Sequence, residues 1–298
     1  MYKVIVPATS ANLGPGFDCL GVALDLYNSI EVEEIGSGLK IESISGNSYY
    51  NNENNLIYKS MKHIFDKVGY NPKGIRIIQK DNIPGTRGLG SSAACIVAGL
   101  LAGNIMTGEK FSKEEIAFMA GALDGHPDNT TPAVFGGLRA SILREEKLHH
   151  VEIQMPDNLK FAAFIPDFTL STAKARMILP RLVSHEDMVF NLGRLALLVS
   201  SLSQGKLENL ALGLEDKMHQ PYRKRFIPDV DKIFSKSMEL GARGCYISGA
   251  GPTLMALVDS EYNKFCDQMG KYILDSLKTS WTIALLNINK NGAEVYTS

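Results

Sequence analysis

A glycine-rich segment followed by a run of small residues constrains this 298-residue chain more than any other feature. The segment Pro84–Ala94 has the sequence PGTRGLGSSAA, and an apolar helical pattern follows from Ser91 onward. Glycines let the backbone approach an anion closely, and a helix that begins there offers free N–H groups and the positive end of its dipole. Ser91 and Ser92 can cap the helix, bind a phosphate oxygen or ligate Mg²⁺. The segment therefore predicts a phosphate-binding loop.

Two common nucleotide-binding loops do not fit this segment. A Walker A loop needs a lysine after its second glycine, and Ser91 stands at that position. A dinucleotide-binding match at Gly88, Gly90 and Ala93 lacks a strand directly before it and an acidic residue about 20 positions after it. A glycine-rich turn that merely starts a helix remains an alternative.

Three further segments place polar residues beside glycine or proline. Their sequences are SANLGPGFD at 10–18, DGHPDN at 124–129 and YISGAGPT at 246–253. Each has an ordinary structural explanation: a turn with side-chain hydrogen bonds, a helix start and a glycine hairpin, respectively. Arg176 and Arg223 can hold a carboxylate or phosphate in bidentate fashion, although a solvated helix face explains most such arginines.

Composition excludes several classes of protein. The formal net charge of −1 and the pI near 6.6 argue against a general nucleic-acid binder. No stretch approaches the ~20 apolar residues that a membrane span needs. The four cysteines lie far apart without metal-ligand spacing, which predicts free thiols in a reducing cytoplasm and neither structural zinc nor disulfides.

Local patterns predict alternating strands and helices, in two domains that cover 1–156 and 157–298. In the first domain, strands are expected at Lys3–Pro7, Val22–Leu26, Ile30–Glu34, Lys40–Ile44, Ile75–Gln79 and Gly137–Leu143. Helices are expected at Leu56–Val68, from Ser91 onward and after Ser112, where Glu115 completes a capping box. The second domain reads as an α+β mixture with strands at Phe161–Ile165, Gly244–Ser248, Thr253–Val258 and Thr282–Ile288. Its helices are expected at Met188–Ser203, from Pro228 and at Tyr262–Leu277.

Taken in order, these segments resemble the GHMP family of small-molecule kinases. The Pro84–Ala93 loop matches the family's glycine-rich signature, and 248–253 resembles its C-terminal glycine motif. Within the family, the segments 10–18, 126–129 and 171–176 resemble the homoserine kinase branch. The resemblance implies an α+β fold with an N-terminal domain like the second domain of ribosomal protein S5 and a ferredoxin-like C-terminal domain. The active site would lie in the cleft between them.

The same resemblance implies where ATP and Mg²⁺ bind. ATP would contact the loop residues Pro84, Gly85, Gly88, Leu89, Gly90, Ser91, Ser92 and Ala93, with the adenine near Asn55. Mg²⁺ would be held by Ser92 or Ser91 and by an acid. That acid is usually Glu in the family, and the matching position here is Asp124, which is one methylene shorter, so that a water could bridge.

For the acceptor L-homoserine, the resemblance carries over seven positions: Asn12, Asp18, His126, Asn129, Thr172, Arg176 and Arg223. Asp18 would pair with the ammonium group of homoserine, and Arg176 and Arg223 would hold its carboxylate, with Arg225 as a second candidate near Arg223. Asn129 and Ser92 are the residues expected at the reacting groups, and no general base is assigned.

Two other functions stay open from the sequence. One is a GHMP kinase with another acceptor, such as mevalonate, and the other is a catalytically inactive member of the fold that binds a ligand. Family analogy alone suggests a homodimer and a place in threonine biosynthesis.

Overall fold

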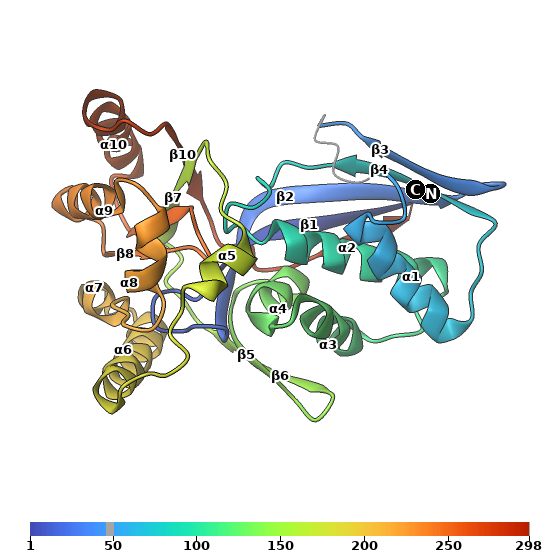
Figure 1. Cartoon of the computed structure of the whole chain (residues 1–298), viewed down its shortest axis with the longest axis horizontal. Helices are drawn as coiled ribbons and strands as arrows, with labels where there is room; N and C mark the ends of the chain where they lie inside the picture. The colour runs from blue at the N-terminus through green and yellow to red at the C-terminus, as the bar shows by residue number, and fades with distance from the viewer. Residues whose placement is uncertain (46–50, 298) are drawn as a thin grey trace.

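The computed structural model describes residues 1–45 and 51–297, which form two sheets lying end to end (Figure 1). Within these residues the first sheet has the strand order β11-β1-β2-β4-β3, with β5 attached to β2 and β6 to β5. Among the described strands of this sheet, β3 and β4 are the one pair that is parallel. The strands are β1 (Tyr2–Ala11), β2 (Leu20–Glu34), β3 (Gly38–Ser43), β4 (Gly74–Lys80), β5 (Leu138–Arg144), β6 (Lys147–Ile153) and β11 (Glu294–Thr297).

Four helices lie on one side of the first sheet (Figure 1); α2, α3 and α4 contact its strands, and α1 packs against α2. They are α1 (Leu56–Val68), α2 (Ser91–Met106), α3 (Lys113–Asp124) and α4 (Pro127–Phe135). Helix α2 is apolar around most of its circumference because it lies between α1, α3 and strand β1. This layer therefore brings the start of α2, the end of α3 and the start of α4 to the end of the sheet that faces the second half of the chain.

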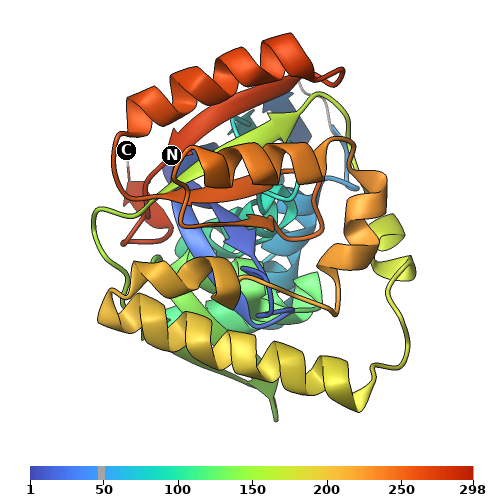
Figure 2. The same cartoon turned by 90° about the vertical axis from the view of Figure 1, so that its left-hand side faces the viewer.

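The second sheet has the strand order β10-β7-β9-β8, and all of its pairs are antiparallel. Its strands are β7 (Lys160–Pro166), β8 (Gly244–Ile247), β9 (Leu254–Val258) and β10 (Trp281–Leu286). Helices α9 (Val230–Glu239) and α10 (Tyr262–Ser276) cover one face, as Figure 2 shows. The order of strands and helices is that of a ferredoxin-like fold.

The long connection between β7 and β8 holds the remaining helical segments. They are α5 (Thr172–Met177), α6 (His185–Gln204), η1 (Leu207–Asn209), α7 (Leu210–Gly213), α8 (Gln220–Arg223) and η2 (Lys224–Phe226). The main apolar core is continuous from the first sheet to Phe161 and Met255 of the second. Strand β11 pairs with β1, so the two ends of the chain lie together. The predicted domain boundary at Pro156 stays a prediction.

Most predicted elements are confirmed, with ends that shift by a few residues. The helix after Ser112 has the full capping box, because Ser112 Oγ accepts from the Glu115 N–H and Glu115 accepts from the Ser112 N–H. No helix in the described ranges is long and apolar enough to cross a membrane.

Two predictions of local structure are wrong. Val22–Leu26 and Ile30–Glu34 belong to the single strand β2, because a bulge opposite Pro7 and Ala8 absorbs the polar interruption between them. Pro228 does not open a helix, because Asp229 takes a left-handed φ of 59° and α9 begins at Val230. The helix start suggested for DGHPDN is confirmed, because α4 begins at Pro127 with His126 as its N-cap.

Candidate active site

The glycine-rich loop has no room for larger residues at two positions. Gly90 caps α2 with a φ of 70°, and a Cβ there would lie 1.9 Å from Thr9 Oγ1. Gly88 has a φ of 77°, and its Cβ would lie 2.3 Å from the Ser248 carbonyl oxygen. Ser91 and Ser92 are the first residues inside the helix, so the suggestion that they cap it is wrong. Their hydroxyl groups are therefore not used for capping.

Two of the segments singled out in the sequence, 10–18 and 246–253, meet at this loop. The Thr9 N–H donates to the Leu89 carbonyl oxygen at 3.1 Å, which joins the loop to β1. Ser248 Oγ donates to the Gly88 carbonyl oxygen at 2.5 Å and lies 2.7 Å from Ser10 Oγ. The loop is thus held between the first strand and the β8–β9 connection, which are more than 230 residues apart.

A cavity of about 280 Å³ opens beside the loop. Most residues predicted for the site line it: Asn12, Asp18, Gly88, Gly90, Ser91, Ser92, Ala93, Asp124, His126, Asn129, Thr172, Arg176 and Arg223. Four predicted ATP contacts do not line it: Pro84, Gly85, Leu89 and Asn55. One concave site therefore unites the predicted phosphate loop with all seven predicted acceptor residues.

Asn55 has a structural explanation within the described part of the chain. Its Oδ1 accepts from the backbone N–H groups of Ile57 and Tyr58, which makes it the N-cap of α1. Its Nδ2 donates to Gln79 Oε1 at 2.7 Å. These contacts assign its side chain to the helix start, and adenine binding near it stays a prediction.

Asp18 and Arg176, which both line the cavity, form a bidentate ion pair. The Arg176 Nη atoms lie 2.7 and 2.9 Å from the two carboxylate oxygens of Asp18. Both side chains are partly exposed, so the pair is screened by water and is open to exchange with a ligand. Asp18 is also oriented by Asn12, whose Oδ1 accepts from the Asp18 backbone N–H.

Arg223, which also lines the cavity, is a buried cation that is 2% exposed. Its Nη1 donates to the Gly249 carbonyl oxygen at 2.8 Å, while among the described residues its Nε has no hydrogen-bond partner. Burial, together with the charge of Arg176, lowers the pKa of the guanidinium to about 10. Arg225, the other candidate, is exposed and lies outside the cavity lining, so geometry favours Arg223.

The turn between α3 and α4 contributes two acids and a histidine. His126 Nδ1 donates to Asp128 Oδ1 at 2.8 Å, and this hydrogen bond raises the pKa of His126. Burial, reinforced by the charge of Asp128, raises the pKa of Asp124 to about 6, against the opposing effect of His126. Asn129 donates to Asp128 Oδ1 and accepts from Thr9 Oγ1 at 2.9 Å, which orients its amide.

Two sets of side chains around this turn differ in how well they suit Mg²⁺ as ligands. Ligand atoms of Asp18, His126 and Asp128 lie within 4.8 Å of one another. Mg²⁺ prefers oxygen ligands, however, and Asp18 is already paired with an arginine. Asp124 and Ser92 offer a carboxylate and a hydroxyl that are within hydrogen-bond reach of each other beside the loop. The second set fits a cation bound together with phosphate oxygens.

Several residues of the cavity were not predicted. They are Thr86, Arg87, Asp128, Gly249 and Ala250. Thr86 and Arg87 lie inside the glycine-rich loop, and Asp128 lies inside the DGHPDN segment, so extending each motif to all its polar members would have found them. Gly249 and Ala250 line the cavity mainly with backbone atoms, and the residue type alone does not predict such a contact.

Both parts of the chain match known family models. The model described as GHMP kinases N terminal domain matches residues 55–137, and the one described as GHMP kinases C terminal matches residues 198–272.

Curated relatives are similar over their whole length. Homoserine kinase of Caldicellulosiruptor saccharolyticus is 51% identical over 300 residues, with 100% of this chain and 97% of the relative covered. Homoserine kinase of Petrotoga mobilis is 48% identical, with 99% of this chain and 96% of the relative covered.

Two of the similar solved structures are also described as homoserine kinases, one of them as putative. The crystal structure of homoserine kinase from Cytophaga hutchinsonii is 30% identical, with a TM-score of 0.88 and coverage of 99% of this chain and 96% of that one. A putative homoserine kinase from Listeria monocytogenes is 27% identical, with a TM-score of 0.82 and full coverage of both chains. A mevalonate kinase from L. major at 17% identity shares the fold, with a TM-score of 0.73 and coverage of 97% of this chain and 96% of that one.

Proposed function

The chain belongs to the GHMP kinase family, and we propose that it transfers the γ-phosphoryl group of ATP to the side-chain hydroxyl of L-homoserine. The observation that carries this proposal is the convergence of the glycine-rich loop with Asp18, Arg176 and Arg223 on a single cavity. A zwitterionic amino acid with a hydroxyl group matches this set. The product would be O-phospho-L-homoserine, an intermediate of threonine biosynthesis.

The Asp18–Arg176 ion pair of the free protein suggests how the acceptor would bind. The ammonium group of homoserine would bind Asp18, and its carboxylate would bind Arg176 and the unpartnered side of Arg223. The substrate would thereby replace the Asp18–Arg176 pair with two complementary ion pairs, which limits the cost of separating the two residues. A hydroxy acid such as mevalonate lacks the ammonium group and would leave Asp18 without a partner.

Phosphoryl transfer depends mainly on alignment and charge neutralisation, because the transition state is loose. The N–H groups at the start of α2 would contact the phosphate oxygens, and Asn129 would orient the acceptor hydroxyl toward the γ-phosphate. Mg²⁺, when bound, would neutralise phosphate charge, and Asp124 and Ser92 are the residues suited to hold it. We assign no side chain as general base. The cytoplasmic location and a homodimer stay predictions.

ADP release by the purified protein with ATP and Mg²⁺ tests the proposal. L-homoserine, mevalonate, galactose and no acceptor are compared, and stimulation is expected with homoserine alone. Stimulation by another acceptor would keep the kinase chemistry and reject the zwitterion argument. Absence of turnover with every acceptor, despite ATP binding, would reject kinase activity and favour an inactive ligand-binding member.

A further inference from the structure

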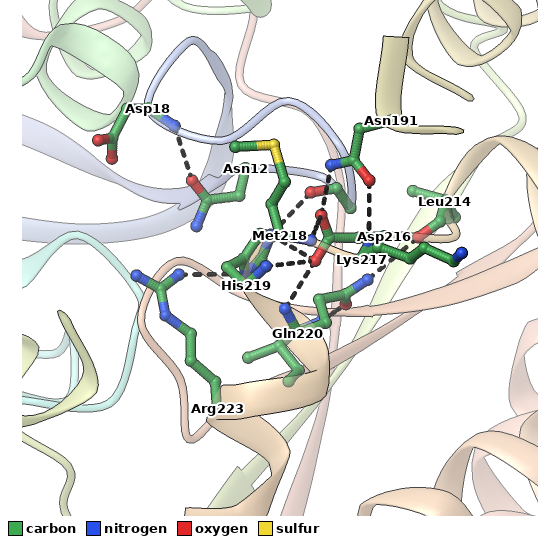
Figure 3. A network of polar contacts seen from close by, with 12 residues as sticks. Asn12, Asp18, Asn191, Leu214, Asp216, Lys217, Met218, His219, Gln220 and Arg223 are labelled. Carbon is green, nitrogen blue, oxygen red and sulfur yellow. Dashed lines mark hydrogen bonds and ion pairs between the residues drawn. The ribbon is translucent and has the colours of Figure 1, made fainter. Parts of the chain in front are cut away.

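His219 is a fully buried histidine, and Figure 3 shows it between Arg223 and Asp216. His219 Nε2 is 2.7 Å from the Gly14 carbonyl oxygen, and His219 Nδ1 is 3.2 Å from Arg223 Nη1. A carbonyl oxygen can only accept, so Nε2 carries the ring proton. Nδ1 is then free to accept a hydrogen bond from Arg223. The two contacts together require the neutral Nε2–H tautomer.

The backbone of His219 is held by a buried carboxylate. Asp216 accepts hydrogen bonds from the backbone N–H groups of Met218, His219 and Gln220. It also accepts one from Asn191 Nδ2 at 2.7 Å. Four donors converge on one anion, so the turn that enters α8 has little freedom to reposition the imidazole.

Gln220 ties the same turn to the second sheet. Its Nε2 donates to the Leu214 carbonyl oxygen, and its Oε1 accepts from the Ile247 N–H at 2.8 Å. Ile247 ends β8 and leads into the loop that contains Gly249. The Gly249 carbonyl oxygen accepts from both Arg223 Nη1 and Asn12 Nδ2 at 2.8 Å. Arg223 Nη1 is therefore held by two acceptors, the Gly249 carbonyl oxygen and His219 Nδ1.

On its other side, His219 contacts the loop that carries the predicted ammonium-binding residue. Gly14 has a φ of 71°, and a Cβ there would lie 2.4 Å from the Leu214 carbonyl oxygen, so the loop packs tightly against the turn. The ring of Phe17, in the same loop, lies 5.3 Å from the His219 ring. Phe17 also lies 5.1 Å from the Arg223 guanidinium and 5.4 Å from that of Arg176.

We propose that His219 is a positioning residue for the acceptor: it sets the orientation of Arg223 and the distance between Arg223 and the loop that carries Asn12 and Asp18. The inference rests on the proposed function for its kinetic consequence. His219 does not line the cavity and makes no contact with a reacting group, so it acts through Arg223. Loss of its Nδ1 acceptor would let the guanidinium rotate away from the carboxylate position, while the phosphate loop stays in place.

Two amide substitutions separate the two contacts of the ring. In His219→Gln, the longer amide can donate to the Gly14 carbonyl oxygen but leaves no acceptor near Arg223. In His219→Asn, the shorter amide can present its oxygen to Arg223 but does not reach Gly14. We expect His219→Gln to raise the KM for homoserine about ten-fold or more, as for loss of a hydrogen bond to a charged group, with the KM for ATP and the Tm near wild type. His219→Asn is expected to raise it less.

The chain offers a matched control in His150, which stacks on Phe135 at 4.3 Å outside this cavity. His150→Gln should leave both KM values unchanged. In an Arg223→Ala background, His219→Gln should have no further effect on the KM for homoserine, because the two residues act as a unit. An unchanged homoserine KM in His219→Gln, or an equal rise for ATP and homoserine, would overturn the inference.

A second measurement does not depend on activity. In protein with ¹⁵N-labelled histidine, NMR should show His219 as neutral with its proton on Nε2, and Arg223→Ala should shift the Nδ1 resonance. If the wild-type protein does not phosphorylate homoserine, the proposed function fails, and this spectrum still decides the positioning contact. A Nδ1 resonance unaffected by Arg223→Ala, or a proton on Nδ1, would reject it.

Discussion

Replacing Asp124 by asparagine should stabilise the free protein at neutral pH although Asp124 is a predicted metal ligand. The carboxyl group is 12% exposed, and burial raises its pKa from 3.8 to about 6. A raised folded-state pKa means that the neutral acid is favoured on folding. Its contribution to stability is therefore present below pH 4 and is lost as the pH rises through about 6. Asparagine resembles the neutral acid at every pH.

The size of the effect follows from the pKa shift. A shift of about two pH units corresponds to about 3 kcal/mol in the free energy of unfolding. Asp124→Asn and wild type should therefore be equally stable near pH 4, and the variant should be more stable by up to this amount at pH 7. His126 Nδ1 lies 3.7 Å from Asp124 Oδ2, so the stability of either protein alone also reflects the charge of His126. The quantity to measure is therefore the difference in the free energy of unfolding between the variant and the wild type.

Urea denaturation of the protein without nucleotide or metal, at intervals from pH 4 to pH 8, provides the assay. Asp157→Asn is the matched control, because Asp157 is exposed and its ion pair with Lys290 lowers its pKa, which gives the opposite sign. A stability difference for Asp124→Asn that does not change with pH would refute the reasoning. A variant less stable than wild type at pH 7 would refute it as well.

Arg176→Ala should raise the KM for homoserine roughly 10- to 100-fold with little change in the KM for ATP, as expected for loss of a charge-assisted hydrogen-bonded pair. Steady-state kinetics measure both values, with the exposed Arg225→Ala as control. The same homoserine KM in both variants would argue against a contact between Arg176 and the carboxylate. Ser92→Asp should abolish ADP release while the circular dichroism spectrum is retained, because a carboxylate at the start of α2 repels the phosphates. ADP release by this variant at the rate of the wild-type protein would contradict the placement of ATP. Gly88→Ala should cost at least roughly 1–2 kcal/mol from its left-handed φ alone, with a further cost from the clash at the Ser248 carbonyl oxygen. Urea denaturation would test this against Gly36→Ala, where a Cβ meets nothing within 4 Å, and equal stability of the two variants would count against it.

Features set by neighbours in the chain were predictable from the sequence. The glycine-rich loop and the helix after it, the capping box at Ser112 and the strand patterns depend on residues a few positions apart. The seven acceptor residues were placed by resemblance, and the structure brings all of them to one cavity. Their roles remain predictions.

Other features depend on packing between distant segments. Asp18 and Arg176 are 158 positions apart, and nothing in either local sequence indicates that they pair. The sequence does not distinguish Arg223 from Arg225, but Arg223 at the end of α8 is buried, whereas Arg225 in η2 is exposed. His219 lies outside the segments singled out in the sequence, and its hydrogen bond to the Gly14 carbonyl oxygen joins residues 205 positions apart. Local sequence specifies which elements form, whereas burial and hydrogen bonding between elements decide which polar side chains meet, because those energies exist only once the chain has folded.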